Sequence, residues 1–105
     1  MPQTVRQYWQ NLHGRVPLNF NWDAINNNSV VLVAAAEYSI DAQNPTASPR
    51  FIAAANVTVS NVSPHGPPYD PTHGVTFVVT IDWPQPINIV TDITVLDDAP
   101  EFIGT

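Results

Sequence analysis

Two residue types are missing from the sequence, cysteine and lysine, and each absence excludes a kind of chemistry. Without cysteine the chain forms no disulfide and offers no thiolate to a metal or a substrate. Without lysine there is no amine for Schiff-base chemistry. The three basic residues also do not form the clusters by which proteins attract phosphate backbones or anionic lipids. We therefore expect neither nucleic acid nor a membrane surface as a partner.

Long apolar segments are absent as well. The longest apolar run, residues 30–36, is too short to cross a bilayer. The first ten residues contain an arginine but lack the apolar centre of a secretory signal. With no signal that directs the chain elsewhere, we expect a cytoplasmic location.

Glycine is scarce and proline is frequent, with four and eleven residues respectively. The chain has 105 residues, nine of them acidic, and a net charge of −6. This length suits one domain that buries a core without disulfides. A low fraction of charged residues (11%) and many prolines fit a β-rich domain, in which proline occurs in loops and protects edge strands. We predict a single domain over residues 1–105.

The strongest secondary-structure signal lies between Gly74 and Asp97. Apolar residues occupy every second position of two runs, which is typical of strands that bury one face. The predicted inner faces comprise Val75, Phe77, Val79, Ile81 and Trp83 in the first run, and Ile87, Ile89, Thr91, Ile93 and Val95 in the second. Pro84-Gln85-Pro86 does not suit a standard three-residue hairpin, because Pro86 cannot adopt a left-handed conformation. This corner is therefore a non-standard hairpin or a crossing between two sheets.

The opposite face of these two runs is too apolar to face water alone, since it carries Val78, Val90 and Leu96. We expect a cover over these side chains. A short helix of the same chain would provide it, and so would a second subunit.

Such a helix is predicted over residues 4–13. Val5, Tyr8, Trp9 and Leu12 have the i, i+3, i+4, i+7 spacing of a helical stripe. Thr4 stands three residues before Gln7, as in a capping box.

The other segments alternate like strands or resemble turns. Strand-like alternation occurs over 15–23, 29–41 and 51–62, and turns or loops are predicted over 24–29, 42–49 and 63–74. Strands thus fall within residues 15–97, and a tail covers 98–105. The predicted fold is all-β and mainly antiparallel, a small β-sandwich or open barrel of about 5–7 strands with the short N-terminal helix.

One proline-stiffened loop contains residues that could bind a metal. His65, Asp70 and His73 supply two imidazoles and a carboxylate, a ligand set that holds iron, zinc or copper in other proteins. No helical or strand spacing forces the three side chains to converge. A divalent metal site and a purely structural loop are the alternatives here.

A second candidate site combines aromatic and amide side chains. Trp22 precedes the turn that contains Asn27 and Asn28, and Tyr69 lies in the proline-rich loop. Many β-sandwich proteins bind sugars with aromatic platforms and amide hydrogen bonds. The alternative for Trp22 is a place in the core, because it falls on the apolar face of its strand.

The candidates together favour binding over catalysis. The chain has no cysteine nucleophile and no G-x-S-x-G motif. We predict a non-catalytic β-sandwich protein that forms homo-oligomers and recognises a protein or a neutral ligand such as a glycan. The alternative is a small metal-dependent enzyme that uses His65, Asp70 and His73.

Overall fold

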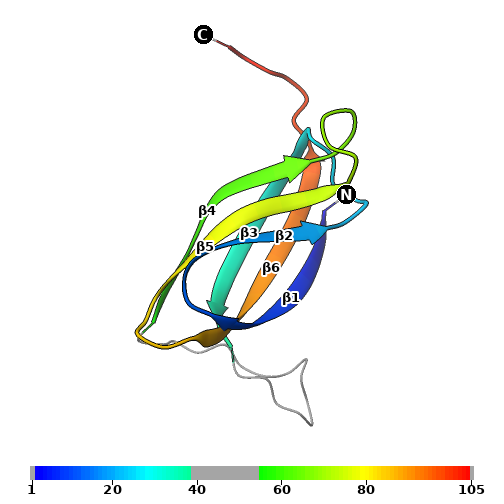
Figure 1. The fold of residues 1–105 in the computed structure, drawn as a ribbon. Coiled ribbons are helices and arrows are strands. Elements are labelled where there is room, and N and C mark those ends of the chain that lie inside the picture. Colours follow the sequence, from blue (N-terminus) through cyan, green and yellow to red (C-terminus); the bar gives the residue numbers. More distant parts are fainter. Residues whose placement is uncertain (1, 39–54, 105) are drawn as a thin grey trace.

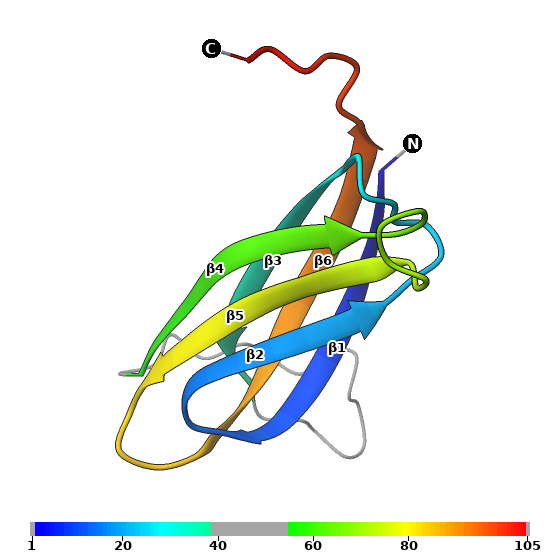
Figure 2. The same cartoon turned by 45° about the horizontal axis from the view of Figure 1, so that its top comes forward.

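The computed structural model describes residues 2–38 and 55–104, which form six antiparallel strands in two sheets. The strands are β1 (Gln3–Leu12), β2 (Gly14–Asn21), β3 (Ser29–Glu37), β4 (Asn56–His65), β5 (Gly74–Asp82) and β6 (Ile87–Asp98). One sheet has the order β1-β6-β3 and the other β2-β5-β4. The sheets face each other as a sandwich (Figure 1, Figure 2). The all-β prediction is confirmed.

Some predictions fall outside the described residues. These are the loop over 42–49 and the adjoining strand ends at 39–41 and 51–54. Within the described part, no helix has the length and hydropathy needed to span a membrane.

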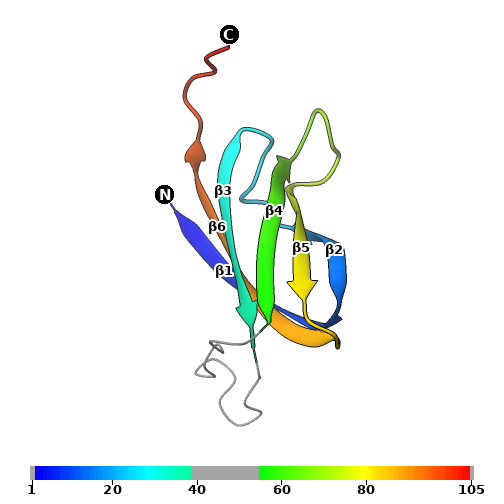
Figure 3. The same ribbon diagram turned by 90° about the vertical axis from the view of Figure 1, so that its left-hand side faces the viewer.

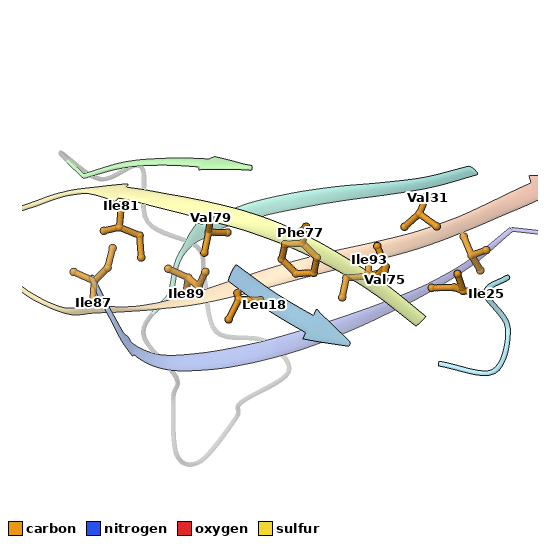
Figure 4. Close-up of a cluster of buried hydrophobic side chains, with 11 residues drawn as sticks. Leu18, Ile25, Val31, Val75, Phe77, Val79, Ile81, Ile87, Ile89 and Ile93 are labelled. Atoms are coloured by element: carbon orange, nitrogen blue, oxygen red, sulfur yellow. The ribbon is translucent and has the colours of Figure 1, made fainter. Parts of the chain in front are cut away.

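The core lies between the central strands of the two sheets, β5 and β6. Phe77, Val79, Ile89 and Ile93 are fully buried there (Figure 4). Burial of each such side chain stabilises the fold by about 1.5–3 kcal/mol. The predicted inner faces are confirmed, with Trp83 half-buried just beyond the end of β5.

The one polar residue of the predicted inner faces, Thr91, is also fully buried. Its hydroxyl accepts a hydrogen bond from the indole Nε1–H of Trp9 at 2.8 Å. This bond offsets the cost of removing the hydroxyl from water. The same indole ring packs edge-on against Phe77, with 6.4 Å between ring centroids.

The Pro84-Gln85-Pro86 corner joins the two sheets. β5 pairs with β2 and β4, whereas β6 pairs with β1 and β3, so no hairpin connects β5 to β6. A second crossing joins β1 to β2, where Gly14 has a φ of 68°. Glycine adopts this left-handed conformation without steric cost.

The predicted helix over residues 4–13 is wrong, because this segment forms β1. β1 pairs antiparallel with β6 from Gln3 to Leu12. The register shifts between Trp9 and Leu12, where Asn11 has a φ of 56°. The extra residue at this point is a β-bulge.

The bulge explains why the sequence of β1 resembles a helix. Val5, Trp9 and Leu12 all pack against the core, although Trp9 and Leu12 are an odd number of residues apart. Without the bulge, they would point to opposite faces. Tyr8 lies on the outer face and packs edge-on against Tyr38, with 6.0 Å between centroids. The i, i+3, i+4, i+7 spacing therefore arises because Tyr8 lies on the outer face and the bulge returns Leu12 to the inner face.

Among residues 2–38 and 55–104, no helix covers the outer faces, and the strands themselves partly shield them. Val90 is 1% exposed and is flanked by Tyr8 of β1 and Ala36 of β3. Val78 is 7% exposed, between Pro17 of β2 and its β4 neighbour. The helix is thus excluded as a cover within the described residues, and cover by a second subunit stays a prediction.

The two sides of the sandwich differ. β3 and β4 run side by side along one flank, whereas β1 and β2 diverge from their shared corner on the other (Figure 3). The outer edges of β1 and β2 therefore face outward from the diverging flank.

Candidate functional site

Two loops meet at one end of the sandwich. Every candidate site residue lies in one of these loops, except His65, which directly precedes the second loop. Residues 22–28 connect β2 to β3, and residues 66–73 connect β4 to β5 (Figure 1). The pairing of Asn21 and of His65 with Gly74 places both loops beside the start of β5. We call residues 22–28 and 66–73 the loop end.

Hydrogen bonds between the loops brace this end. The amide of Trp22 donates to the carbonyl of His73 at 2.8 Å. In return, His73 Nδ1 donates to the carbonyl of Ile25 at 2.6 Å. Ile25 has no exposed surface and belongs to the core cluster (Figure 4), so it anchors the first loop in the sandwich.

Close backbone packing adds to the bracing. A Cβ on Gly66 would lie 3.1 Å from the Cα of Asn26 and 3.4 Å from the amide nitrogen of Asn27. A Cβ on Gly74 would clash with the carbonyl oxygen of Phe20. Glycine at position 66 thus allows the close approach of the two loops, and glycine at position 74 allows the close approach of β5 to β2.

Hydrogen bonds within the first loop stiffen it and form a turn where one was predicted, over 24–29. The Asn26 side chain accepts a hydrogen bond from the amide of Asn28 at 2.8 Å, which is an Asx-turn. The amide of Asn26 donates to Ser29 Oγ at 3.0 Å. Asn26 Nδ2 and Ser29 Oγ both lie within 3.4 Å of the Asp98 carboxylate, so the loop is tied to the end of β6.

His65 connects β4 to the second loop and to β2. Its Nδ1 donates to the carbonyl of Thr72 at 2.7 Å, and its Nε2 lies 2.7 Å from Asn19 Oδ1. The same Asn19 oxygen accepts a hydrogen bond from the Thr76 hydroxyl. Both ring nitrogens of His65 therefore have partners in the fold, and only 15% of the side chain is exposed.

Asp70 closes a turn of the second loop. Its Oδ1 accepts hydrogen bonds from the hydroxyl of Thr72 at 2.7 Å and from the amide of Thr72 at 2.8 Å. These two donors lower the pKa of the Asp70 carboxyl below its ordinary value, with a smaller contribution from the His65 ring. The carboxylate is exposed enough that water screens it.

The structure brings together part of the predicted metal set. Asp70 Oδ1 lies 3.8 Å from His65 Nδ1, so these two side chains are neighbours. His73 instead directs Nδ1 to the Ile25 carbonyl. Across residues 2–38 and 55–104, no group of three or more His, Asp or Glu side chains is arranged to hold a metal ion.

The predicted ligand-binding residues divide into exposed and packed ones. Tyr69 is 84% exposed at the tip of the second loop, and Asn28 is exposed on the first. Asn27 is half-buried. Trp22 packs against the core and stacks edge-on with Phe20, with 6.2 Å between centroids. The contacts of Trp22 thus agree with the alternative given above, a place against the core.

Sequence reasoning missed the residues that position this end. Asn19, Thr72 and Gly66 each make a bracing contact, yet none belongs to a motif. Asn19 and His65 are 46 residues apart in the chain. The single hint was the presence of polar side chains near the ends of predicted strands.

No protein-family model, no curated protein and no solved structure matches this chain. Function must therefore be inferred from the contacts of the described residues.

Proposed function

We propose that the protein is a non-catalytic binding and assembly module. In this proposal, copies of the chain associate with one another, and the loop end recognises a protein or a neutral ligand such as a glycan. The cytoplasmic location expected from the sequence stays a prediction.

One observation carries the proposal: the two histidines at and beside the loop end hold its two loops in place. His65 bonds to Thr72 and contacts Asn19, and His73 bonds to Ile25. A general base needs a nitrogen or oxygen that can reach a substrate proton. The ring nitrogens engaged in these contacts fix the two loops relative to each other, which suits a rigid binding platform.

The composition of the loop end supports a neutral ligand. Asp23 and Asp70 contribute carboxylates, and neither loop contains an arginine. Such a surface repels anions. The exposed ring of Tyr69 offers an apolar face to a sugar ring or to a partner side chain, and an aromatic side chain contributes binding area at a low cost in conformational entropy.

The alternative, a metal-dependent enzyme at His65, Asp70 and His73, gains no support from the geometry, since these residues do not form a ligand set. Stoichiometric metal in the purified protein, lost in both His65→Ala and His73→Ala, would favour that alternative instead.

The substitution Tyr69→Ala tests recognition at the loop end. We expect wild-type protein to bind members of an array of neutral glycans or peptides, and the variant to bind at least about tenfold more weakly, because loss of an aromatic anchor typically costs more than 1 kcal/mol. Calorimetry on the captured ligand measures the change.

Phe102→Ala provides the matched control, because Phe102 is 96% exposed and lies in the C-terminal tail beyond β6. This variant should bind like the wild type. Equal binding by Tyr69→Ala and the wild type would place recognition elsewhere and contradict the proposal for the loop end.

A further inference from the structure

The edges of the two sheets are not equally open. Among the described strands, β3 and β4 lie beside each other, so each covers the edge of the other (Figure 3). β2 contains Pro17. Because the amide of Trp22 bonds to His73 on the β5 side, alternation directs the nitrogen of Pro17 outward. Proline therefore removes a donor from the outer edge of β2.

β1 is the remaining edge, and it has no proline between Gln3 and Leu12. No described strand lies beyond it on the side away from β6 (Figure 2). An edge of this kind is a template for another strand.

The polar groups on this edge can be assigned from the pairing. The amide of Tyr38 bonds to the carbonyl of Asn88, so even-numbered positions of β6 face β3 and odd-numbered positions face β1. The β1 partners of the odd-numbered positions, such as Gln7 opposite Thr91, bond inward to β6. Before the bulge, the backbone amides and carbonyls of Thr4, Arg6 and Tyr8 consequently point outward.

One outward carbonyl already has a local donor. Gln7 Nε2 bonds to the carbonyl of Tyr8 at 3.1 Å. This bond shows that the edge carbonyl accepts a donor where one is within reach. Pairing with another strand would replace the Gln7 side chain with a backbone amide.

The side chains on the outer face of β1 are held in place before any partner arrives. Arg6 donates to both carboxylate oxygens of Asp92, at 2.7 and 3.2 Å. Tyr8 packs edge-on against Tyr38. Pre-ordered side chains lose little conformational entropy on binding.

The sequence of β1 is self-complementary about Gln7. In an antiparallel pair of two β1 strands centred on Gln7, polar residues face polar ones, apolar residues face apolar ones, and arginine faces tyrosine. The cross-strand pairs are Thr4 with Gln10, Val5 with Trp9, and Arg6 with Tyr8, each occurring twice. A guanidinium beside a tyrosine ring is a favourable cation–π pair.

Charge permits two copies of this chain to meet through the diverging flank. The protein has a net charge of −6, so copies repel each other over most approaches. β1 and β2, which form the diverging flank, contain Arg6 and Arg15 and no acidic residue. Two copies that meet through this flank bring no carboxylates of these strands together.

We propose that two copies of the chain pair antiparallel through β1, about a twofold axis at Gln7, and join their sheets in the order β3-β6-β1-β1-β6-β3. The inference rests on the self-association proposed above and specifies its interface. Gln7 faces its counterpart as a non-hydrogen-bonded pair, with about 4.5 Å between the two Cα atoms. That separation is within the range that a disulfide spans.

The absence of cysteine from the wild type makes a disulfide test direct. The variant Gln7→Cys should form a covalent dimer in an oxidising glutathione buffer, seen on a non-reducing gel, at least about tenfold faster than Thr80→Cys. Thr80 is exposed on β5 and away from the interface. Thermal unfolding of the reduced variants confirms that both fold.

The register has its own test. Thr4→Cys alone should not cross-link, because the two copies of position 4 lie about 20 Å apart, six strand positions from each other. An equal mixture of Thr4→Cys and Gln10→Cys should give the mixed dimer. Cross-linking by Thr4→Cys alone would overturn the register.

The remaining outcomes separate this interface from self-association in general. If the wild type associates in light scattering but Gln7→Cys cross-links no faster than Thr80→Cys, the β1 interface is wrong and self-association stands. If the wild type stays a monomer at every concentration, both proposals fail.

Discussion

At the scale of single residues, Asp70 links the geometry of the loop end to pH. The Thr72 hydroxyl and amide donate to its ionised carboxylate and lower its pKa below the ordinary value of 3.8. A lowered folded-state pKa stabilises the fold above the unfolded-state value. This contribution is lost as pH falls through the folded-state pKa. The sensitive window therefore lies below about pH 3.8.

The substitution Asp70→Asn should flatten this acid limb. At pH 7 we expect the variant to be less stable than the wild type, because the Thr72 donors lose an ionised acceptor. The difference should shrink as the pH falls below about 3.8, where the wild-type carboxyl becomes protonated. Urea denaturation of both proteins at neutral and at acidic pH measures it.

Thr72→Ala is the complementary variant, because it removes the hydroxyl donor and retains the amide. It should move the pKa of Asp70 back toward the ordinary value, as seen in an NMR titration of the carboxyl carbon. An identical pH slope for the wild type and Asp70→Asn would show that these hydrogen bonds contribute nothing.

Contacts at this scale were the least predictable from sequence. The sequence nominated two separate candidate sites, and the structure places their residues in or next to the loop end. The turn over 24–29 followed from its asparagines. The approach of Asn19 to His65 did not follow, since it depends on β2 and β4 flanking β5 on opposite sides. Local sequence contains no information about that strand order.

At the scale of elements, β1 shows how a bulge can imitate a different secondary structure. The extra residue at Asn11 changes which positions of β1 face the core, so the apolar residues of this strand have the spacing expected of a helix. The extra residue of β6 lies after Val95, beyond its buried positions, and the inner faces of β5 and β6 were predicted correctly. Alternation shows which side chains point inward, but it does not say which sheet a strand joins. The Pro84-Gln85-Pro86 crossing therefore stayed open until the pairing was known.

The bulge predicts the cost of substitutions at Asn11. Asparagine tolerates its φ of 56°, whereas a β-branched residue does not. We expect Asn11→Val to lower the free energy of unfolding by about 1–2 kcal/mol, and Asn11→Gly to change it little. Chemical denaturation measures both.

Gln10→Val is the matched control, since Gln10 is an exposed neighbour with no positive φ. Its unfolding free energy should stay within about 0.5 kcal/mol of the wild type. If Asn11→Val were as stable as Gln10→Val, the left-handed bulge would not exist in solution.

At the scale of the whole molecule, the surfaces proposed for recognition and for assembly are different. The loop end lies at one end of the sandwich, and the β1 edge lies along its diverging flank (Figure 1, Figure 3). A dimer through β1 would therefore carry two loop ends. Two sites on one particle raise the apparent affinity for a repeated ligand such as a polysaccharide without any new contact.

Sedimentation equilibrium of the wild-type protein tests the central claim, self-association, most directly. The account predicts that the average mass rises with concentration from 11.5 kDa toward twice that value. A mass of 11.5 kDa at every concentration, up to the millimolar range, would contradict it.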